Sequence, residues 1–415
     1  MLVKVLIALT VVIIVARLMG ALFKRLDQPA VIGEVVGGIM LGPSLFGRIA
    51  PDAAAFVLPA DAAPFLSIIS QLGVILYMFL VGLELDLAVL RTKARITIAI
   101  SNAGIIVPFA LGVALAWAIH QDYAPPGVTL APFTLFIGVS LSVTAFPVLA
   151  RILSDHGLQR TTMGIVALTC AAIGDATAWC LLALVVGVTQ ASTGAAIVTI
   201  LMTVVYVVLM LTAGRALMSR AVPRLDASIS VGEQSLTLVL VAVLLSALAT
   251  EFIGVHAIFG AFLFGAIIPH KSAIARHVRE RIEDVVRVMF LPAFFAFTGL
   301  RTEIGLVQGL DDWLMCLLII AIATAGKFGG ATLAAKASGL DWLDSAALGI
   351  LMNTRGLVEL IVLNIGLDLG VLTPRLFTML VLMALVTTMM TSPILMWLLR
   401  KRPWTDAATL HRESA

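Results

Sequence analysis

Charged residues are scarce in this sequence. They make up 12% of its 415 residues, whereas about 25% is typical of a soluble globular protein. Hydrophobic residues make up 61%, and the mean hydropathy is +1.10. This composition excludes an ordinary soluble protein and indicates an all-α polytopic membrane protein surrounded by the lipid bilayer. The net charge of +3 does not indicate a nucleic-acid partner, because the basic residues lie mostly in short loops between apolar runs.

Reactive side chains are also few. The three cysteines, Cys170, Cys180 and Cys316, all lie inside apolar segments, so we interpret them as small buried residues rather than disulfides or metal ligands. The sequence contains no recognisable metal-ligand cluster, nucleophile motif or phosphate-binding loop. We therefore expect a protein that is not an enzyme and that holds no cofactor.

What the chain has in abundance is apolar runs long enough to cross a membrane as helices. We predict thirteen spans, at residues 2–23, 31–47, 65–84, 95–119, 131–153, 161–189, 193–217, 235–252, 254–270, 285–300, 312–336, 343–366 and 374–399. Residues 1–402 are thus predicted to form one membrane transport domain, and residues 403–415 a short cytoplasmic tail.

Positive charge is distributed unevenly over the loops. On one side, Lys and Arg cluster at 24–25, 91–95, 151–160, 220–224, 271–287, 336 and 400–402, whereas the opposite loops hold only Arg48, Arg301 and Arg375. Cytoplasmic loops of membrane proteins carry the excess of Lys and Arg. We therefore predict an integral protein of the plasma (inner) membrane, with its amino terminus outside and its carboxyl terminus in the cytoplasm.

The order of the spans indicates an internal repeat. The first six and the last six are offset by seven positions, so matching spans run in opposite directions, which is the inverted repeat of secondary transporters. The matched segments 131–153 and 343–366 are both interrupted by polar or helix-breaking residues, namely Ser140, Ser142, Thr144, Pro147, Asn353, Arg355 and Glu359. Interrupted helices at matched positions indicate a binding site. Close helix packing is the alternative reading for the Ser and Thr residues alone.

A single acid, Asp175, lies about halfway along the apolar segment 161–189. A charge at that depth costs at least ~2.5 kcal/mol on insertion scales, so such residues usually line a pathway or pair with an opposite charge. A buried acid that only holds a neighbouring helix in place is the alternative.

Three further ionisable residues, Lys327, Arg355 and Glu359, are predicted at the same depth. Arg355 and Glu359 are four residues apart, so they lie on one helix face and can form an ion pair that stabilises the helix break. Asn353 and Pro147 are also expected to stabilise the breaks. Asp175 and Lys327 then remain as the predicted second pair, with Lys327 compensating the charge.

A lone carboxylate can hold either a proton or a small alkali cation, but not both. Hydroxyl oxygens of Ser140, Ser142 and Thr144, together with unwound backbone, would complete the cation shell around Asp175. Competition at this carboxylate is sufficient for exchange of a monovalent cation, K+ or Na+, for H+. Because one carboxylate carries one positive charge at a time, we predict that the exchange is electroneutral.

Eight stretches in order along the chain resemble one known family. They are QPAVIGEVVGGIMLGPSLFG (28–47), LGVILYMFLVGLELD (72–86), SVTAFPVLARIL (142–153), GDATAWCLLAL (174–184), GVHAIFGAFLFGAIIP (254–269), FLPAFFAFTGLRT (290–302), GKFGG (326–330) and MNTRGLVELIVLNIG (352–366). Together they are similar to the transmembrane domain of the monovalent cation:proton antiporters, in the branch that holds glutathione-gated potassium efflux systems and plant cation/H+ exchangers.

The resemblance implies a core domain, at about 95–189 and 312–399, that contains two crossed and partly unwound helices. It would move like an elevator against a dimerisation domain formed by the remaining spans, in a homodimer. It also implies that Asp175 is the ion-carrying carboxylate, that Lys327 is the core-domain lysine, and that Ser142 and Thr144 belong to the unwound stretch.

One position departs from the family pattern. Relatives commonly carry Asp-Asp or Asn-Asp where this chain has Gly174-Asp175. Because the first side chain of that pair is missing, a non-transporting membrane sensor is one alternative to an exchanger. A gated cation channel is another, although no stretch resembles a selectivity filter.

Overall fold

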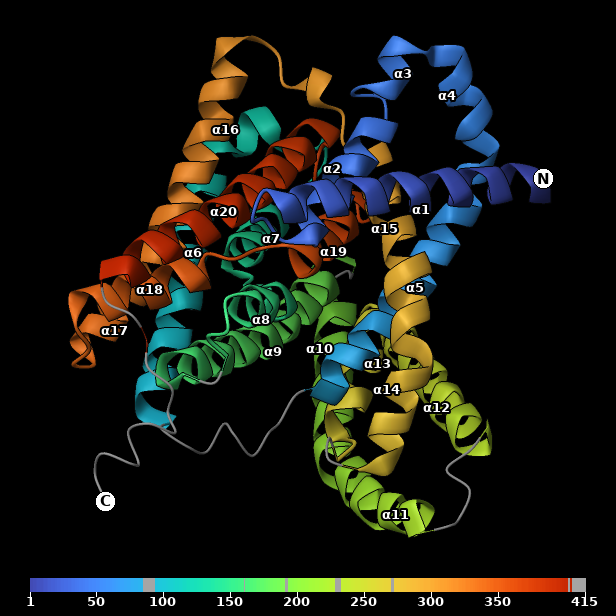
Figure 1. Ribbon diagram of the computed structural model, residues 1–415, viewed down its shortest axis with the longest axis vertical. Helices are drawn as coiled ribbons and strands as arrows, with labels where there is room; N and C mark the ends of the chain where they lie inside the picture. Colours follow the sequence, from blue (N-terminus) through green and yellow to red (C-terminus); the bar gives the residue numbers. More distant parts are fainter. Residues whose placement is uncertain are drawn as a thin grey trace. The chain divides into compact units, whose positions relative to one another are not determined.

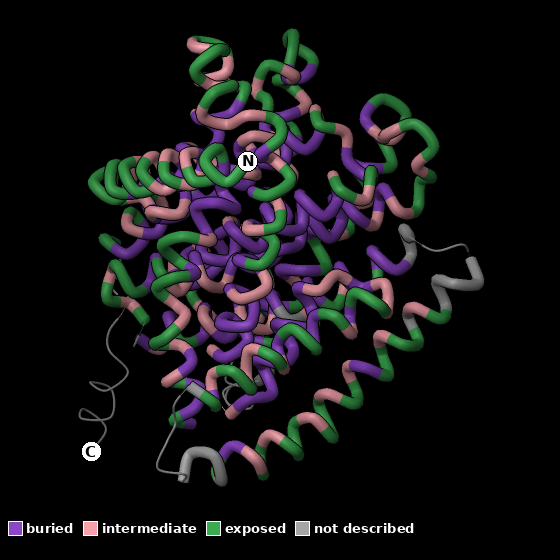
Figure 2. Tube along the Cα trace, turned by 90° about the vertical axis from the view of Figure 1, so that its right-hand side faces the viewer, coloured by how far each residue is buried: buried purple, intermediate pink, exposed green. Residues whose placement is uncertain are grey.

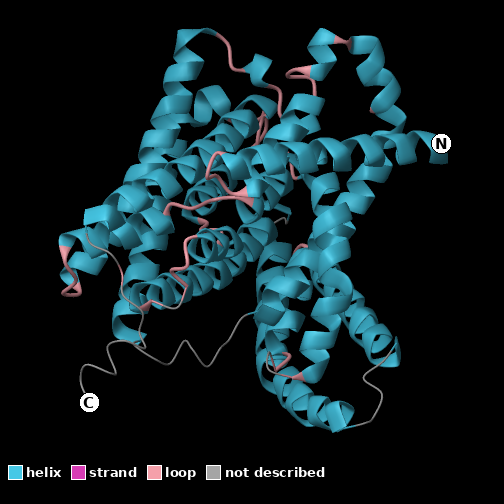
Figure 3. Ribbon diagram, viewed as in Figure 1, coloured by secondary structure: helices cyan, strands magenta, loops and turns pink. Residues whose placement is uncertain are grey.

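The computed structural model describes residues 1–84, 94–159, 161–190, 193–227, 233–269, 272–401 and 404, and this part of the chain contains helices but no strands (Figure 3). Basic loop residues Arg91, Lys93, Arg160, Lys271 and Arg402 lie outside the described residues, as does the predicted tail 403–415 apart from Trp404. Within a continuous helix the backbone groups bond to one another, as the hydrocarbon core of a membrane requires.

The helices follow the predicted apolar runs closely. In chain order they are α1 (Leu2–Arg25), α2 (Ala30–Leu41), α3 (Phe46–Ile49), α4 (Pro51–Val57), α5 (Ala63–Glu84), α6 (Ala94–Tyr123), α7 (Leu130–Ser142), α8 (Phe146–Asp155), α9 (Thr162–Gln190), α10 (Thr193–Leu209), α11 (Arg215–Ala227), α12 (Glu233–Ile253), α13 (Ala257–Ile267), α14 (Ala273–Val285), α15 (Leu291–Leu300), α16 (Gly309–Thr324), α17 (Gly330–Ala337), α18 (Trp342–Met352), α19 (Leu357–Asp368) and α20 (Pro374–Lys401). Three π-helical turns, Met210–Gly214, Val286–Phe290 and Ala325–Gly329, join consecutive helices.

The structure contains eleven or twelve helical spans in its described part, where thirteen were predicted. Within the described ranges, eleven helical segments are long and apolar enough to cross a membrane. The pair α18 and α19, bent by 43° at its break, can count as a twelfth. The remaining predicted span, 254–270, contains α13, a shorter apolar helix of 11 residues.

The chain divides into two compact units. One consists of Met1–Val15, Ala50–Val89 and Ala183–Phe297, and the other of Ala16–Ile49, Leu90–Leu182 and Thr298–Ala415. All the predicted site residues belong to the second unit. The proposed roles of a moving core and a dimerisation part stay a prediction.

Within the second unit, α6 packs along α7 and α17, while α20 packs along α16, α18 and α19 (Figure 1). Its apolar core includes Leu149 of α8, Ala171 of α9, Leu348 of α18 and Leu395 of α20. The core therefore gathers around the broken helices. Buried residues run almost without interruption through α18 and α19. The helix α1, which begins at the marked amino terminus, is mostly exposed or half-buried (Figure 2).

Candidate functional site

The first helix break separates α7 from α8 at residues 143–145. Pro147 has no N–H to donate, and inside a helix its ring would collide with the carbonyl of the residue four positions earlier, Val143. The helix therefore ends at Ser142, and Val143 and Ala145 take extended conformations. Pro147 then lies in the first turn of α8, where a missing N–H costs nothing.

The second break separates α18 from α19 at residues 353–356, and the two breaks contact each other. The Ala145 amide donates to the Thr354 carbonyl at 3.0 Å, and the Thr144 hydroxyl donates to the Met352 carbonyl at 3.3 Å. Gly356 lies against α8, because a Cβ at this position would be 2.6 Å from Cγ2 of Val148. The structure thus contains the two interrupted helices predicted from the matched segments, and they meet at their breaks, as the family resemblance implies.

Arg355 lies in the second break but binds the carboxyl end of the first broken helix. Its side chain is fully buried, with Nη1 donating to the Ser140 carbonyl at 2.8 Å and Nη2 to the Leu141 carbonyl at 2.7 Å. Nη1 also donates to Oε2 of Glu359 at 2.9 Å, so the predicted ion pair forms. The guanidinium group therefore binds two carbonyls that the end of α7 leaves without helical partners.

Lys327 does not form the predicted ion pair with Asp175. The lysine lies in the π-helical turn Ala325–Gly329, and its fully buried ammonium donates to the Ser142 carbonyl and to the Thr144 hydroxyl. Lys327 and Asp175 still interact electrostatically. The physical reason is that the last carbonyl of α7 needs a donor and carries partial negative charge, so it takes the ammonium.

Asp175 lies in the continuous helix α9 and is only 1% exposed. The backbone N–H of Phe146, at the amino end of α8, acts on its carboxylate as a weak hydrogen-bond donor. By standard hydrogen-bond distance and angle, neither carboxylate oxygen has a partner among the described residues. Because buried polar atoms are nearly always bonded, two unpartnered oxygens on one buried acid are unusual and call for an explanation such as a bound ion.

The hydroxyl groups predicted to complete a cation shell are not equally available. The Ser142 hydroxyl is already bonded to the carbonyls of Gly138 and Ile105, at 2.7 and 3.1 Å, and the Thr144 hydroxyl lies between Lys327 and Met352. The Ser140 hydroxyl, by contrast, is buried without a partner in the described part of the chain. Of the three, Ser140 is the one whose hydroxyl is free to bind.

Further unpartnered polar atoms gather in the second break and in the first turn of α19 after it. They are both amide atoms of Asn353, the hydroxyl of Thr354, Nε of Arg355 and Oε1 of Glu359, and all four residues are fully buried. The Asn353 side chain thus makes no hydrogen bond across the break within the described ranges, although it was predicted to stabilise it. Its backbone amide does close the end of α18, at 3.2 Å from the Gly349 carbonyl.

The sequence interpretation missed one residue of the site, Thr388 of α20. Its hydroxyl accepts from the Arg355 amide at 2.9 Å and donates to the Arg355 carbonyl at 2.8 Å, so it holds the unwound backbone on both sides. Several buried hydroxyl residues in an apolar span, Thr387, Thr388, Thr391 and Ser392, are the signal that could have identified it.

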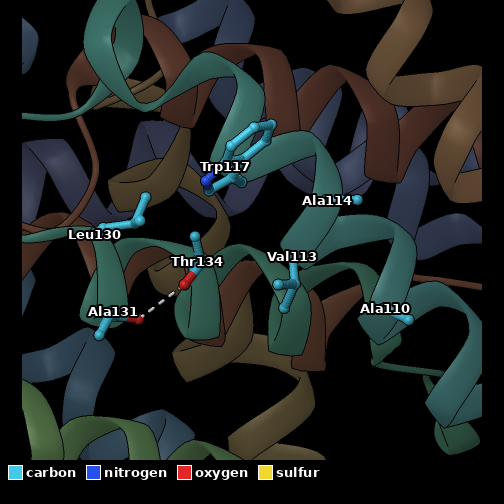
Figure 4. Close-up of a pocket in the computed structure, with 7 residues that line it drawn as sticks. All are labelled: Ala110, Val113, Ala114, Trp117, Leu130, Ala131 and Thr134. Carbon is cyan, nitrogen blue, oxygen red and sulfur yellow. Dashed lines mark hydrogen bonds between the residues drawn. The ribbon is translucent and has the colours of Figure 1, made fainter.

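A hollow of about 530 Å³ between α6 and α7 is a separate feature. It is lined mostly by apolar side chains, including Val113, Trp117 and Leu130, and the Thr134 hydroxyl is bonded to the Ala131 carbonyl (Figure 4). The lining contains no acidic side chain, and its one hydroxyl group is bonded within its own helix. The crossing is therefore the candidate ion site.

Comparisons with known proteins agree with this geometry. Residues 11–401 match the family model described as sodium/hydrogen exchanger, transmembrane. The chain is 45% identical over 386 residues to the Na(+)/H(+) antiporter NhaS4 of Synechocystis, covering 92% of this chain and 94% of that protein. It is 36% identical over 394 residues to the K(+)/H(+) antiporter 1 of Saccharomyces cerevisiae, covering 92% of this chain but 45% of that protein.

The fold has a solved counterpart in the sodium proton antiporter MjNhaP1 of Methanocaldococcus jannaschii. The TM-score is 0.67 at 13% sequence identity, and the match covers 95% of this chain and 96% of that one. The backbone arrangement is therefore similar although few residues are identical. Because the family model matches nearly the whole sequence, this chain belongs to the sodium/hydrogen exchanger transmembrane family.

Proposed function

We propose that the protein is a secondary antiporter that exchanges a monovalent cation, K+ or Na+, for H+ by alternating access. Family membership supports cation/proton exchange, and the names of the relatives include both Na+/H+ and K+/H+ antiporters. The observation on which the proposal mainly rests is Asp175, a buried carboxylate with neither oxygen bonded among the described residues.

The binding chemistry follows from this carboxylate. The Asp175 oxygens either coordinate the cation or one of them accepts the proton, and each event removes the same negative charge. The Ser140 hydroxyl, also unpartnered in the described structure, is a further ligand of the site. Thr144 and Ser142 act mainly through Lys327, whose ammonium they hold in place.

The charges at the crossing determine the stoichiometry. Asp175 and Glu359 contribute two negative charges, and Lys327 and Arg355 contribute two positive charges. The empty site is therefore neutral, and it carries +1 whether it holds a proton or a monovalent cation. An exchange of one proton for one cation then moves no net charge across the membrane, so turnover is electroneutral as long as Lys327 keeps its proton.

The test uses purified protein in liposomes that contain a pH-sensitive dye, with K+ or Na+ gradients imposed in turn. We expect cation-driven proton movement in the wild type, insensitive to an imposed membrane voltage, and none in Asp175→Asn. Persistence of exchange in Asp175→Asn would show that another group is the carrier. Turnover that accelerates with voltage would exclude electroneutral exchange.

Asp312→Asn is the matched control for that experiment. Asp312 is only 3% exposed, but its oxygens are bonded to the Gln308 amide at 2.9 Å, to Nε of Arg375 at 2.8 Å and to the Tyr123 hydroxyl at 3.2 Å. We expect its replacement to lower stability while cation-driven exchange continues. The homodimer and the plasma-membrane location stay predictions.

A further inference from the structure

Four half-helix ends meet at the crossing, and each of them carries partial charge. Amino ends are positive and carboxyl ends are negative, by about half an elementary charge. The amino end of α8 lies next to Asp175, and α19 has Glu359 in its first turn. Both positive ends thus have a carboxylate nearby.

The two carboxyl ends, of α7 and α18, differ in the groups that donate hydrogen bonds to their carbonyls. The last three carbonyls of α7, those of Ser140, Leu141 and Ser142, accept hydrogen bonds from the cationic side chains of Arg355 and Lys327. Two full positive charges therefore lie at the end of one helix.

The end of α18 is occupied by neutral donors. Its carbonyls at Gly349 and Ile350 accept from the Asn353 amide, at 3.2 and 3.1 Å, and that of Leu351 accepts from the Thr354 amide at 3.1 Å. The Met352 carbonyl accepts from the Thr144 hydroxyl. Among the described residues, no hydrogen bond joins a Lys or Arg side chain to these carbonyls. This end is thus the one to which no cationic side chain is bonded directly, although Lys327 bonds the Thr144 hydroxyl next to it.

The Asn353 side chain lies at this same end. It is fully buried, and both its amide atoms lack partners among the described residues. Whichever way the amide is turned, one unpartnered atom is an oxygen that can bind a cation. The residues on either side of Asn353 connect it to the first break, because Met352 accepts from Thr144 and Thr354 accepts from Ala145. The residue after Ala145 is Phe146, whose backbone amide acts on Asp175.

We propose that the carboxyl end of α18, with the Asn353 side-chain oxygen, is part of the binding site for the transported alkali cation and determines which cation it prefers. This inference rests on the proposed antiport at Asp175. The cation supplies the positive charge that the end of α18 lacks, and it loses hydration water to the Asn353 oxygen and to Asp175. A bound proton, which sits on one carboxylate oxygen, makes no use of Asn353. The Asn353 side chain therefore affects cation affinity rather than proton affinity.

The test measures the cation concentration that gives half-maximal exchange, for K+ and Na+ separately, in proteoliposomes of Asn353→Ala, Asn353→Ser and Asn353→Asp. A ligand to a charged group is worth roughly a tenfold change in affinity or more. We expect Asn353→Ala to raise half-saturation about tenfold by that estimate and to change the Na+/K+ ratio. Asn353→Asp adds a negative charge, so half-saturation should fall and turnover should become sensitive to voltage.

Asn364→Ala is the matched control, because Asn364 is a buried asparagine whose amide is fully engaged. Its Oδ1 accepts from Arg301 at 3.0 Å, and its Nδ2 donates to Thr298 and to the Leu360 carbonyl, both at 2.9 Å. We expect this variant to unfold at a lower temperature with the wild-type Na+/K+ ratio. A purely structural Asn353 would behave in the same way.

Different results would refute this inference and the proposed function. Unchanged half-saturation and an unchanged Na+/K+ ratio in the folded fraction of all three Asn353 variants would overturn this inference, even if the yield of protein falls. Exchange that persists in Asp175→Asn would instead overturn the proposed function. Cation-dependent thermal stabilisation of the detergent-solubilised protein, which falls as affinity falls, gives a second readout that does not depend on turnover.

Discussion

The buried ion pair at the crossing allows a sharp prediction about stability. Glu359 and Arg355 are both fully buried and their charged atoms are 2.9 Å apart. Removal of one partner from a buried pair costs about 3–5 kcal/mol, because the other charge stays buried without compensation. Glutamine keeps a hydrogen-bond acceptor, so we expect Glu359→Gln to lower the free energy of unfolding by about 3 kcal/mol, the lower end of that range.

The chain contains a pair of the same spacing in a different environment. Arg151 and Asp155 of α8 are also four residues apart and 3.0 Å apart, but their side chains are 52% and 41% exposed. Such a pair contributes only about 0.3–0.5 kcal/mol. Asp155→Asn should therefore change the unfolding free energy by less than a fifth of the effect of Glu359→Gln.

Arg355→Met should be the most severe of the three substitutions. It leaves Glu359 without its partner and also removes two hydrogen bonds to the carbonyls at the end of α7. Denaturant titration of the detergent-solubilised proteins, followed by tryptophan fluorescence, gives the three free energies. If Glu359→Gln costs no more than Asp155→Asn, the buried pair does not stabilise the break and the reasoning is refuted.

Three further outcomes are expected. Thr388→Val leaves the buried amide of Arg355 without an acceptor and should cost about 1–3 kcal/mol in the same titration. Gly299→Ala should prevent correct folding, seen as loss of monodisperse protein in size-exclusion chromatography, because its Cβ would lie 2.0 Å from the carbonyl carbon of Gly38. Gly174→Asp adds a second carboxylate next to the proposed carrier and should make cation/proton exchange accelerate with imposed voltage.

Each of these three substitutions has a control substitution that is measured in the same assay. In the described part of the chain, Thr391 donates to a carbonyl of its own helix, at 3.2 Å, and to no group of the break, so Thr391→Val should have a smaller effect than Thr388→Val. Gly305→Ala should be tolerated, since the nearest atom to its Cβ would be 3.9 Å away. Gly174→Ala should fold and remain insensitive to voltage, because the added Cβ meets only the Ser101 hydroxyl, at 4.0 Å.

The spans could be predicted because membrane insertion depends on local composition. The predicted segment 235–252 corresponds to α12, Glu233–Ile253, and the predicted segment 374–399 to α20, Pro374–Lys401. The first break was predictable for the same reason, since Pro147 excludes a continuous helix through its own residues. Such signals need no knowledge of what lies beside the segment.

The partners of the buried charges could not be predicted in this way. The spacing of Arg355 and Glu359 along one helix was enough to predict their ion pair. The predicted pairing of Lys327 with Asp175 considered side-chain charges and not the backbone carbonyls at a helix end. In the structure its ammonium binds the Ser142 carbonyl, whose need for a donor arises only when α7 ends there. The π-helical turn that contains Lys327 and the contact of Thr388 with Arg355 likewise depend on neighbouring helices.

The two breaks also supply each other with donors, and this limits how the site can move. Arg355 of the second break binds the end of the first broken helix, and Thr144 of the first break binds the end of α18. Hydrogen bonds to a charged group contribute about 1.5–3 kcal/mol each, so pulling the two breaks apart would cost several kcal/mol in the two Arg355 contacts alone. Because each 1.36 kcal/mol on a barrier slows a step tenfold, breaking the two Arg355 contacts at every turnover would slow transport by about 10²–10⁴-fold. We therefore expect access to Asp175 to change by movement of the crossing as one body, and not by separation of its two broken helices.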